Sequence, residues 1–494
     1  MNGRRASLAF AGSVILLISA CGQKPGVADQ CSAAGGLPPG ATIDAEGNIV
    51  DAEGNIIGQG GGTSGLGTSS DLGGSSSSGT DGSSSGSSTG GSSTGGSTTD
   101  GGTADDTSGG NPSGGDTTGV TNDTITIGAH APLTGAAPVP SDSAEKGKDL
   151  YFRWMAKNGK TVNGRKVEIV LKNDNYNPSQ AVAVCKEMVE QEKVFILSGS
   201  AGTDQIQACA RYAASVGVPY LSAGVTEVGL TGLPGYFATT MTYPDQGPLL
   251  ADMLVDDLGA KSEKNGMVRF DTPNFQDAHD AFVRAMTAKG AKVVYDRAVS
   301  KGSDQTVAQT VVQELKAAGI ENVNVLMSPI FFIQVLQAAR TQQYSPQWVG
   351  VGIQMTFDTV ATVGCRNGTL DKAKMFAPFP AWVDRNRYDA DFDKALRAFY
   401  ADSECNSNGC GDDFIWLAWS GAKTSWELLS LPGRDLTRER FVYEMERARG
   451  LSNGIGPRLS FSPGDHFGAD EVHVSEARCS DARWHTLKSF VKDF

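Results

Sequence analysis

Beyond its first twenty residues the sequence contains no apolar run long enough to cross a membrane as a helix. Positive charge is also scarce, with 42 Lys and Arg against 55 Asp and Glu and a formal net charge of −13. A surface that binds nucleic acid needs clustered Lys and Arg. We therefore expect no nucleic-acid partner.

Catalytic signatures are missing as well. After residue 122 there is no Gly-x-Ser-x-Gly elbow, no His-Glu-x-x-His, no Walker loop and no Gly-x-Gly-x-x-Gly. The segment "SGSAG" lacks the glycine two places before Ser200 that an elbow needs, and the five histidines form no recognisable pairing. These absences predict a protein that is not an enzyme and needs no cofactor or metal. A hydrolase is the less favoured alternative, which turnover of esters or amides would support.

Residues 21–122 lack what a folded core needs. No Lys or Arg follows Lys24 within this stretch, and no aromatic residue occurs between Phe10 and Tyr151. Residues 58–120 are almost entirely Gly, Ser, Thr and Asp, a composition typical of a flexible coil. We predict a disordered tether. The tandem "DAEGNIVDAEGNII" at 44–57 is assigned to it, with a small hairpin or a weak cation site as alternatives.

The start of the chain carries an export signal. Arg4 and Arg5 form a basic head before the apolar residues 8–18, which are too few to span a bilayer. The stretch "ISAC" resembles the lipobox of bacterial lipoproteins, which implies a signal peptide over 1–20 and a diacylglyceryl group on Cys21. Two acyl chains hold a protein stably at a membrane. We expect a lipid-anchored protein on the extracellular face, at the cell surface or in the periplasm.

The remaining cysteines favour disulfides, because an exported protein meets an oxidising environment. Cys405 and Cys410 are close enough in sequence to pair locally, although a zinc clip is an alternative for them. Spacing alone does not fix the connectivity. Two further pairs are expected: Cys185 with Cys209, on successive predicted helices, and Cys365 with Cys479.

From residue 123 onward, short β-branched runs alternate with helical patterns. Strands are expected at "TITIGAHAPL", "KVEIVLKND", "VFILSGS" and "VPYLSAG", with helices over 144–157, 178–192 and from about Asp204. The alternation restarts after residue 243, with a helix expected over 275–289 and Gly319 as the residue that ends another. Such repetition predicts α/β architecture, with two mainly parallel sheets flanked by helices and a cleft between two lobes.

Several segments, in this order, are similar to the leucine/isoleucine/valine type of substrate-binding protein of ABC transporters: "ITIGAHAPLTGAAP", "NDNYNPSQAVAVCKEMVEQEKVFILSGS", "YFATTMTYPDQGP" and "GPRLSFSPGDH". The resemblance implies a two-lobed type I periplasmic-binding fold with a three-strand hinge. It places the first lobe at 123–243 and 380–452, and the second at 244–379 and 453–494. It also implies a small-molecule ligand, a permease partner and a monomer.

In the first lobe, small polar residues follow two strands where each leads into a helix or turn. In open α/β sheets ligands bind beyond the carboxyl ends of the strands, and a helix N-terminus favours an anion. The resemblance implies that the matching positions hold a carboxylate of the ligand. The expected contacts are Ser200, Ala201, Thr203, Ser222, Gly224 and Thr226, with helix capping as the alternative role of the Ser and Thr residues.

The second lobe departs from the family pattern. Where amino-acid binders carry an acidic residue for the ligand's ammonium group, "QWVGVG" is followed by Ile353 and Gln354. A buried ammonium group without a carboxylate partner is costly, so the ligand is expected to lack one unless Asp271, Asp277 or Asp358 supplies the charge.

Aromatic residues are expected to contact the body of the ligand. Phe275 replaces the family's clamping tyrosine, and Phe414 resembles its aromatic contact from a late helix. The predicted function is capture of a small carboxylate-bearing or amino-acid-like solute for an ABC importer. The alternative is a surface receptor module of the same fold that signals through a partner.

Overall fold

The computed structural model describes residues 42–43, 48–50, 56–59 and 114–494, apart from 136, 200, 223–227, 261–262, 367 and 401–410. The chain divides into two units, 1–103 and 104–494. The predicted signal peptide with Cys21, the contact residues Ser200, Gly224 and Thr226, and the pair Cys405 and Cys410 lie outside the described residues, as does the side chain of Gln354. Among the described residues, no helix is both long and apolar enough to cross a membrane.

In the first unit the tandem repeat contributes to a small antiparallel sheet of strands β1 (Thr42–Ile43), β2 (Asn48–Val50) and β3 (Ile56–Gln59). Strands β2 and β3 begin in successive copies of the repeat, and each contains β-branched residues, which favour extended backbone. The segment assigned to the tether therefore contains the hairpin that was its alternative.

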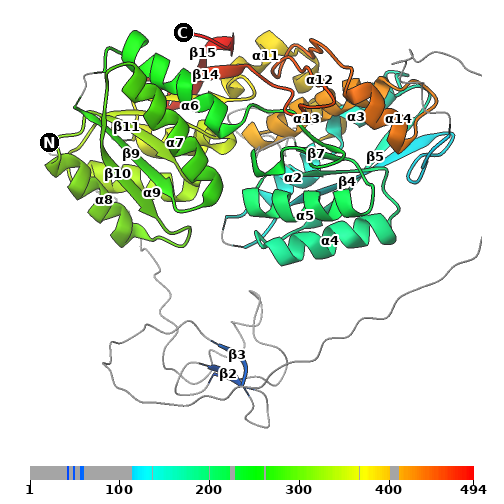
Figure 1. Cartoon of the computed structure of the whole chain (residues 1–494), viewed down its shortest axis with the longest axis horizontal. Helices are drawn as coiled ribbons and strands as arrows, with labels where there is room; N and C mark the ends of the chain where they lie inside the picture. The colour runs from blue at the N-terminus through cyan, green and yellow to red at the C-terminus, as the bar shows by residue number, and fades with distance from the viewer. Residues whose placement is uncertain are drawn as a thin grey trace, which may run out of the picture. The chain divides into compact units, whose positions relative to one another are not determined.

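The first sheet of the second unit has the order β5-β4-β6-β7-β8, and all its strands are parallel. One face packs against α4 and α5 and the other against α2, α3, α13 and α14, so apolar residues line both faces (Figure 1). We call this sheet and its helices the first lobe. Its strands are β4 (Thr124–Ala131), β5 (Lys166–Asn173), β6 (Ile196–Gly199), β7 (Tyr220–Ser222) and β8 (Tyr236–Ala238). Its helices are α2 (Ser141–Gly147), α3 (Leu150–Lys157), α4 (Pro178–Glu190), α5 (Thr203–Ser215), α12 (Asp391–Phe399), α13 (Asp413–Ser430) and α14 (Arg438–Met445).

The second sheet has the order β10-β9-β11-β12-β13-β14-β15, parallel as far as β13 and antiparallel over its last two pairs. Helices α8, α9 and α10 cover one face, and α6 and α7 cover the other (Figure 1). This is the second lobe. Its strands are β9 (Asn265–Phe270), β10 (Val293–Val299), β11 (Asn322–Leu326), β12 (Gln347–Val351), β13 (Lys374–Ala377), β14 (Val472–Arg478) and β15 (Arg483–Val491). Its helices are α6 (Tyr243–Asp252), α7 (Pro273–Ala288), α8 (Gln305–Ala317), α9 (Pro329–Thr341) and α10 (Asp358–Cys365).

The two sheets with flanking helices match the predicted α/β class. The chain passes from one lobe to the other after β8, after β13 and before β14. Ile455, Leu459 and Phe461 belong to the core of the first lobe, and Phe467 bridges to Ala238 at the edge of its sheet. We therefore propose that the last crossing lies near residue 469, whereas the family resemblance placed it near 452.

The predicted helices are present with small shifts at their ends, and Gly319 follows α8 with a φ of +63°, as expected of a residue that ends a helix. The helix expected over 144–157 is instead split into α2 and α3. At the end of α2, a Cβ on Gly147 would lie 2.8 Å from the Cβ of Ala418 on α13. This close packing between helices leaves no mark in the local sequence.

Two of the expected disulfides are present. Cys185 on α4 is bonded to Cys209 on α5, so one bond joins the two helices that cover one face of the first sheet. Cys365 at the end of α10 is bonded to Cys479, which follows β14. Both predicted pairings are confirmed.

Candidate functional site

A cavity of about 80 Å³ lies between the carboxyl ends of the two sheets. Residues of both lobes line it, as expected of a site at the strand ends of open α/β sheets. The first lobe contributes Ala137, Tyr176, Ala201, Gly202 and Thr203. The second lobe contributes Tyr243, Phe270, Phe275, Lys301, Met327, Ser328, Pro329, Gly352 and Met355. We call this space the interlobe cavity.

Lys301 is the charged side chain among the described residues that line the interlobe cavity. It follows β10, and its Nζ lies 2.5 Å from Oδ2 of Asp204 in the first turn of α5. The same ammonium group lies 5.7 Å from the centre of the Tyr176 ring, within range of a cation–π contact. Lys301 therefore links the second lobe to two residues of the first.

Aromatic rings form much of the wall. Tyr243, at the start of α6, and Phe275, in the first turn of α7, lie with their ring centres 5.6 Å apart. Tyr176 faces the cavity from the first lobe, and burial raises the pKa of its hydroxyl, with Asp204 and Asp174 adding to the effect. The phenol therefore stays neutral and can donate a hydrogen bond.

The start of α5 supplies backbone donors. Gly202 precedes the helix with a φ of +81°, and a Cβ there would clash with Oε1 of the buried Gln205 side chain, so a side chain is disfavoured in both respects. Gly202 has no side chain with which to cap the helix, and the first amide groups of an α-helix find no partner within the helix itself. This arrangement favours an anion.

No Asp or Glu is among the described residues that line the interlobe cavity. Of the three acids considered as partners for an ammonium group, Asp358 has its carboxylate 2.7 Å from Arg483. Asp271 and Asp277 do not line the cavity. The formal charge of the described lining is therefore that of Lys301 alone, and Lys301 is paired with Asp204, which does not line the cavity.

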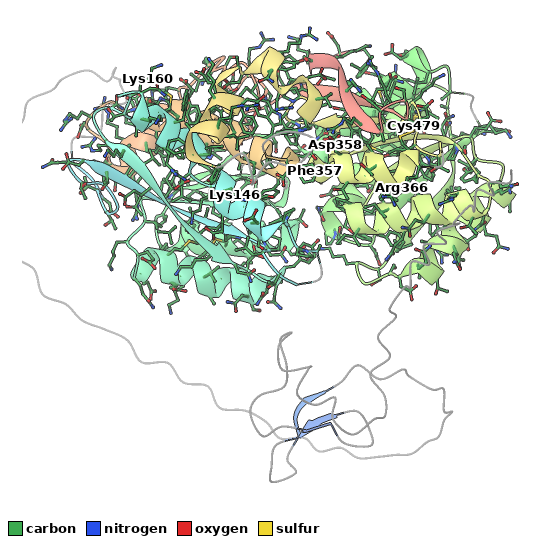
Figure 2. All side chains as sticks on the ribbon, turned by 180° about the vertical axis from the view of Figure 1, so that it is seen from behind. Lys146, Lys160, Phe357, Asp358, Arg366 and Cys479 are labelled. Atoms are coloured by element: carbon green, nitrogen blue, oxygen red, sulfur yellow. A yellow bond between two sulfur atoms is a disulfide. The ribbon has the colours of Figure 1, made fainter. Side chains whose placement is uncertain are left out.

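Asp358 takes part in a junction between the lobes (Figure 2). Its backbone N–H donates to the carboxylate of Asp413 on α13 at 2.9 Å, and the neighbouring Phe357 ring meets that of Phe414 edge to face. Burial raises the pKa of Asp413 well above its ordinary value, and the nearby Asp358 carboxylate adds to this. Two carboxyl groups thus share a poorly solvated contact.

The structure brings three of the predicted contact residues together, because Ala201, Thr203 and Phe275 all line the interlobe cavity. Ser222 is fully buried at the end of β7, and its carbonyl accepts the hydroxyl of Thr239. Phe414 lies elsewhere, in the wall of a second cavity inside the first lobe. Their roles as ligand contacts stay predictions.

Several lining residues were not predicted, among them Tyr176, Tyr243, Lys301 and Met355. Tyr176 and Lys301 both follow a strand, β5 and β10 respectively, so their positions at strand ends were readable from the sequence. That they meet across the cavity depends on how the lobes close, which local sequence does not encode.

The described structure engages both ring nitrogens of His130 in hydrogen bonds within the first lobe. A carboxylate can only accept, so His130 Nδ1–H donates to Asp174 at 2.8 Å and Nε2 accepts the Tyr220 hydroxyl at 2.7 Å. All three side chains are buried. This chain of hydrogen bonds fixes the end of β4.

Comparison with known proteins identifies relatives of the folded part. Residues 124–482 match the family model described as periplasmic binding protein. An amino acid binding protein of Pseudomonas aeruginosa is 26% identical over 199 residues, which is 40% of this chain and 52% of that protein. The chain thus spans about half the length of the curated relatives it matches.

Solved structures share the fold. A branched-chain amino acid ABC transporter protein from Thermus thermophilus with bound valine has a TM-score of 0.61 at 16% identity, over 76% of this chain and 98% of its own. A solute-binding protein of an ABC transporter from R. palustris in complex with 4-hydroxybenzoate has a TM-score of 0.60 at 19% identity, over 75% and 98%. At these identities the likeness concerns the fold.

Proposed function

Because the chain belongs to the periplasmic binding protein family, we propose that it is the solute-binding component of an ABC importer and captures a small carboxylate-bearing ligand in the interlobe cavity. The observation that carries the proposal is the described lining of that cavity, which combines Lys301 with four aromatic rings and includes no Asp or Glu. The acid that pairs with Lys301, Asp204, is not part of that lining. An amino acid would bring an ammonium group that this lining leaves unpaired.

Each part of such a ligand has a partner in the cavity. Lys301 and the first amides of α5 suit the carboxylate, since hydrogen bonds to charged groups are stronger than those between neutral groups. Tyr243 and Phe275 present ring faces and edges to a flat apolar body. The neutral Tyr176 hydroxyl suits a polar substituent. An aromatic acid fits this set, and one of the neighbouring structures holds 4-hydroxybenzoate.

The residues expected from the family resemblance complete the proposed site. Ser200, Ala201, Thr203, Ser222, Gly224 and Thr226 form the carboxylate side of the site, with Phe275 and Gln354 on the side of the ligand's body. Phe414, which lines a second cavity inside the first lobe, is not assigned to this site. The protein is a monomer, anchored through Cys21 on the outer face of the membrane, and delivers its ligand to a permease. It performs no catalysis.

The proposal predicts that 4-hydroxybenzoate binds more tightly than leucine in isothermal titration calorimetry. We expect an affinity near micromolar, about −8 kcal/mol, which suits capture and release. Lys301→Met removes the cation and should weaken binding at least tenfold, because a charged hydrogen bond contributes about 1.5–3 kcal/mol. Lys289→Met is the matched control, since Lys289 pairs with Asp252 within the second lobe.

Two results would contradict the proposal. Tighter binding of leucine than of the aromatic acid would show that the ligand class is wrong. Unchanged binding in both Ser200→Trp and Thr226→Trp, in protein that remains folded, would place the site elsewhere.

A further inference from the structure

A second cavity, of about 120 Å³, lies inside the first lobe between the sheet and helix α13. Its lining shares no residue with the described lining of the interlobe cavity. Strands β4 and β5 form its floor through Ile127, Ile169 and Leu171, and helices α2 and α3 contribute Ala144 and Phe152. We call it the core cavity.

Small residues on one face of α13 create the space. Ala418, Gly421, Ala422 and Ser425 recur at the spacing of one helix face and all line the core cavity. Phe414 lines it at the start of the same helix, so the lining runs over about 16 Å at 1.5 Å per residue. The core cavity is therefore long and follows the helix axis.

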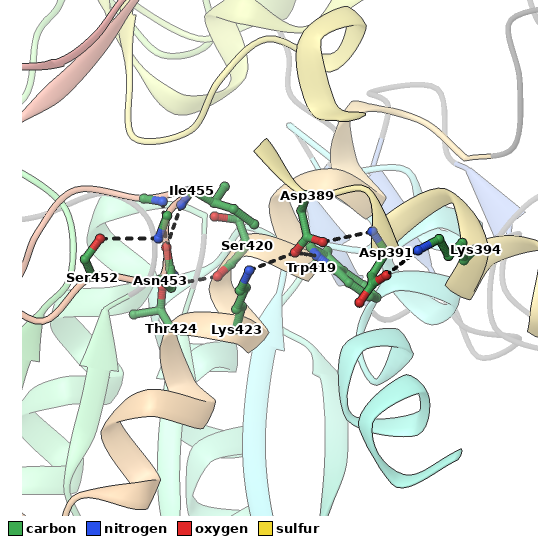
Figure 3. Close-up of polar contacts among 12 residues, drawn as sticks. Asp389, Asp391, Lys394, Trp419, Ser420, Lys423, Thr424, Ser452, Asn453 and Ile455 are labelled. Carbon is green, nitrogen blue, oxygen red and sulfur yellow. Dashed lines mark hydrogen bonds and ion pairs between the residues drawn. The ribbon is translucent and has the colours of Figure 1, made fainter. Parts of the chain in front are cut away.

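Contacts on the opposite face hold α13 in place (Figure 3). Asp389 accepts from Trp419 Nε1 at 3.1 Å and from Lys423 Nζ at 2.9 Å. Thr424 accepts from Asn453 Nδ2 at 2.6 Å. With its outer face held at these points, the helix cannot settle onto the sheet without losing hydrogen bonds, and the space beneath it persists.

The side chains beneath α13 are not fully packed. Ile169 and Leu171 remain partly exposed although they lie on the face of the sheet that the helices cover. Dry apolar cavities on the order of 150 Å³ take up apolar guests in place of water. The walls of the core cavity are mostly apolar, so an apolar guest suits them better than water does.

One charged side chain, Lys148, is among the described residues that line the core cavity, and no acid is among them. Its ammonium group lies 2.5 Å from Glu145 one helical turn away, and both side chains reach solvent. Exposed pairs of this kind contribute little to stability, so an incoming carboxylate can compete for the lysine. His130 also lines the cavity, but both of its ring nitrogens are engaged within the lobe.

We infer that the core cavity is a second ligand site, which binds a monocarboxylic acid with an unbranched alkyl chain. The chain lies along α13 between the sheet and the small residues of the helix, and the carboxylate pairs with Lys148. A slender chain suits a long space lined by Ala, Gly and Ser better than a bulky ring does. The site acts independently of the interlobe cavity.

The test uses the full chain and decanoate, measured by displacement of a fluorescent alkyl carboxylate. Ala422→Leu fills the core cavity and should weaken decanoate binding at least tenfold while leaving 4-hydroxybenzoate binding unchanged. Ser425→Val, on the same face of α13, serves if Ala422→Leu does not fold. Lys148→Met should abolish the preference for decanoate over decanol, whereas Lys146→Met, whose lysine pairs with Asp142 and does not line the cavity, should not.

The opposite pattern overturns the inference. If Lys301→Met weakens decanoate binding and the filling variants do not, the acid binds in the interlobe cavity. If decanoate does not bind, or binds equally well to wild type and both filling variants, the core cavity is a packing defect of the first lobe.

Discussion

His473 on β14 is buried with an imidazole that is only half satisfied. Its Nε2–H donates to the carbonyl of Ile455 at 2.7 Å, while Nδ1 has no hydrogen-bond partner among the described residues. The rings of Phe490 and Tyr388 lie against it. Burial lowers the pKa of His473 to about 4, from 6.5, because a charged imidazolium cannot be solvated there.

This shift predicts a loss of stability in mild acid. Between pH 6.5 and 4 the unfolded chain binds a proton that the folded protein does not, so the stabilisation present above pH 6.5 is lost as the pH falls towards 4. The shift corresponds to about 3 kcal/mol. His473→Gln keeps a donor for Ile455 and should remove this part of the pH dependence, as measured by urea unfolding at pH 7, 5 and 4.

The contribution of His473 is measured as the difference between variant and wild type in the pH dependence of the free energy of unfolding, because other groups titrate over the same range. Asp413 acts in the opposite direction, because its raised pKa makes the folded state take up a proton and gain stability as the pH falls. His485→Gln is the control, since this histidine pairs with Asp481 near the surface. Equal pH slopes in His473→Gln and wild type would show that His473 does not contribute.

For single residues, the sequence predicted the features that depend on where a residue lies along a strand or helix. Thr203 was placed at a strand end where the interlobe cavity forms, whereas Phe275 was expected from the family resemblance. The pairing of Lys301 with Asp204 was not predictable, because the two residues come from different lobes and are 97 positions apart. Contacts made by lobe closure leave no periodic signal.

At the scale of helices and strands, the two disulfides differ in how far apart in the sequence their cysteines lie. Cys185 and Cys209 are 24 residues apart, whereas Cys365 and Cys479 are 114 apart. A crosslink that closes a longer loop removes more conformational freedom from the unfolded chain. The bond between α10 and the end of β14 should therefore stabilise the protein more.

The loop lengths predict contributions of about 3 kcal/mol for Cys185–Cys209 and about 5 kcal/mol for Cys365–Cys479. The double variants Cys365→Ser/Cys479→Ser and Cys185→Ser/Cys209→Ser each retain one of the two bonds. Reducing the remaining bond in each double variant then gives the contribution of that bond to the free energy of unfolding, without a further substitution. Guanidinium unfolding with and without dithiothreitol gives both values. A larger loss from the shorter loop would contradict the entropic explanation.

The sequence predicted the end of a helix where local chemistry determines it, and failed where packing between distant residues determines it. Gly319 ends α8 because glycine tolerates positive φ, and this was readable from the sequence. The break between α2 and α3 lies where Gly147 comes close to α13, a contact between residues far apart in the chain. The core cavity was missed for the same reason, since small residues on α13 also fit a tightly packed helix.

For the whole molecule, the proposed capture of a ligand requires an equilibrium between open and closed lobes. In the structure Lys301 and Asp204 join the rim of the interlobe cavity, and both side chains are partly exposed. Exposed ion pairs contribute at most about 1 kcal/mol, so this pair biases closure without locking it. A bias of this size changes the ratio of closed to open molecules by about fivefold.

Asp204→Asn should therefore shift the ligand-free protein towards the open form. The expected result is a larger radius of gyration in small-angle X-ray scattering, with the largest difference from wild type at low salt, because salt screens exposed charges. The exchange Asp204→Lys/Lys301→Asp restores an ion pair with reversed polarity. It should recover closure in the absence of ligand while placing a carboxylate in the cavity, so that 4-hydroxybenzoate no longer binds.

The control is Asp252→Asn, which removes the same charge from an ion pair with Lys289 inside the second lobe and should leave the scattering unchanged.

The exchanged variant separates two roles of Lys301, because closure requires only opposite charges whereas ligand binding requires the cation on the second lobe. If the exchanged variant stays open, the rim contact depends on the Tyr176 ring as well as on charge, since the ring attracts a cation but not a carboxylate. If Asp204→Asn scatters as wild type does at low salt, the ion pair does not bias closure, and the junction of Asp358 with Asp413 is the next contact between the lobes to test.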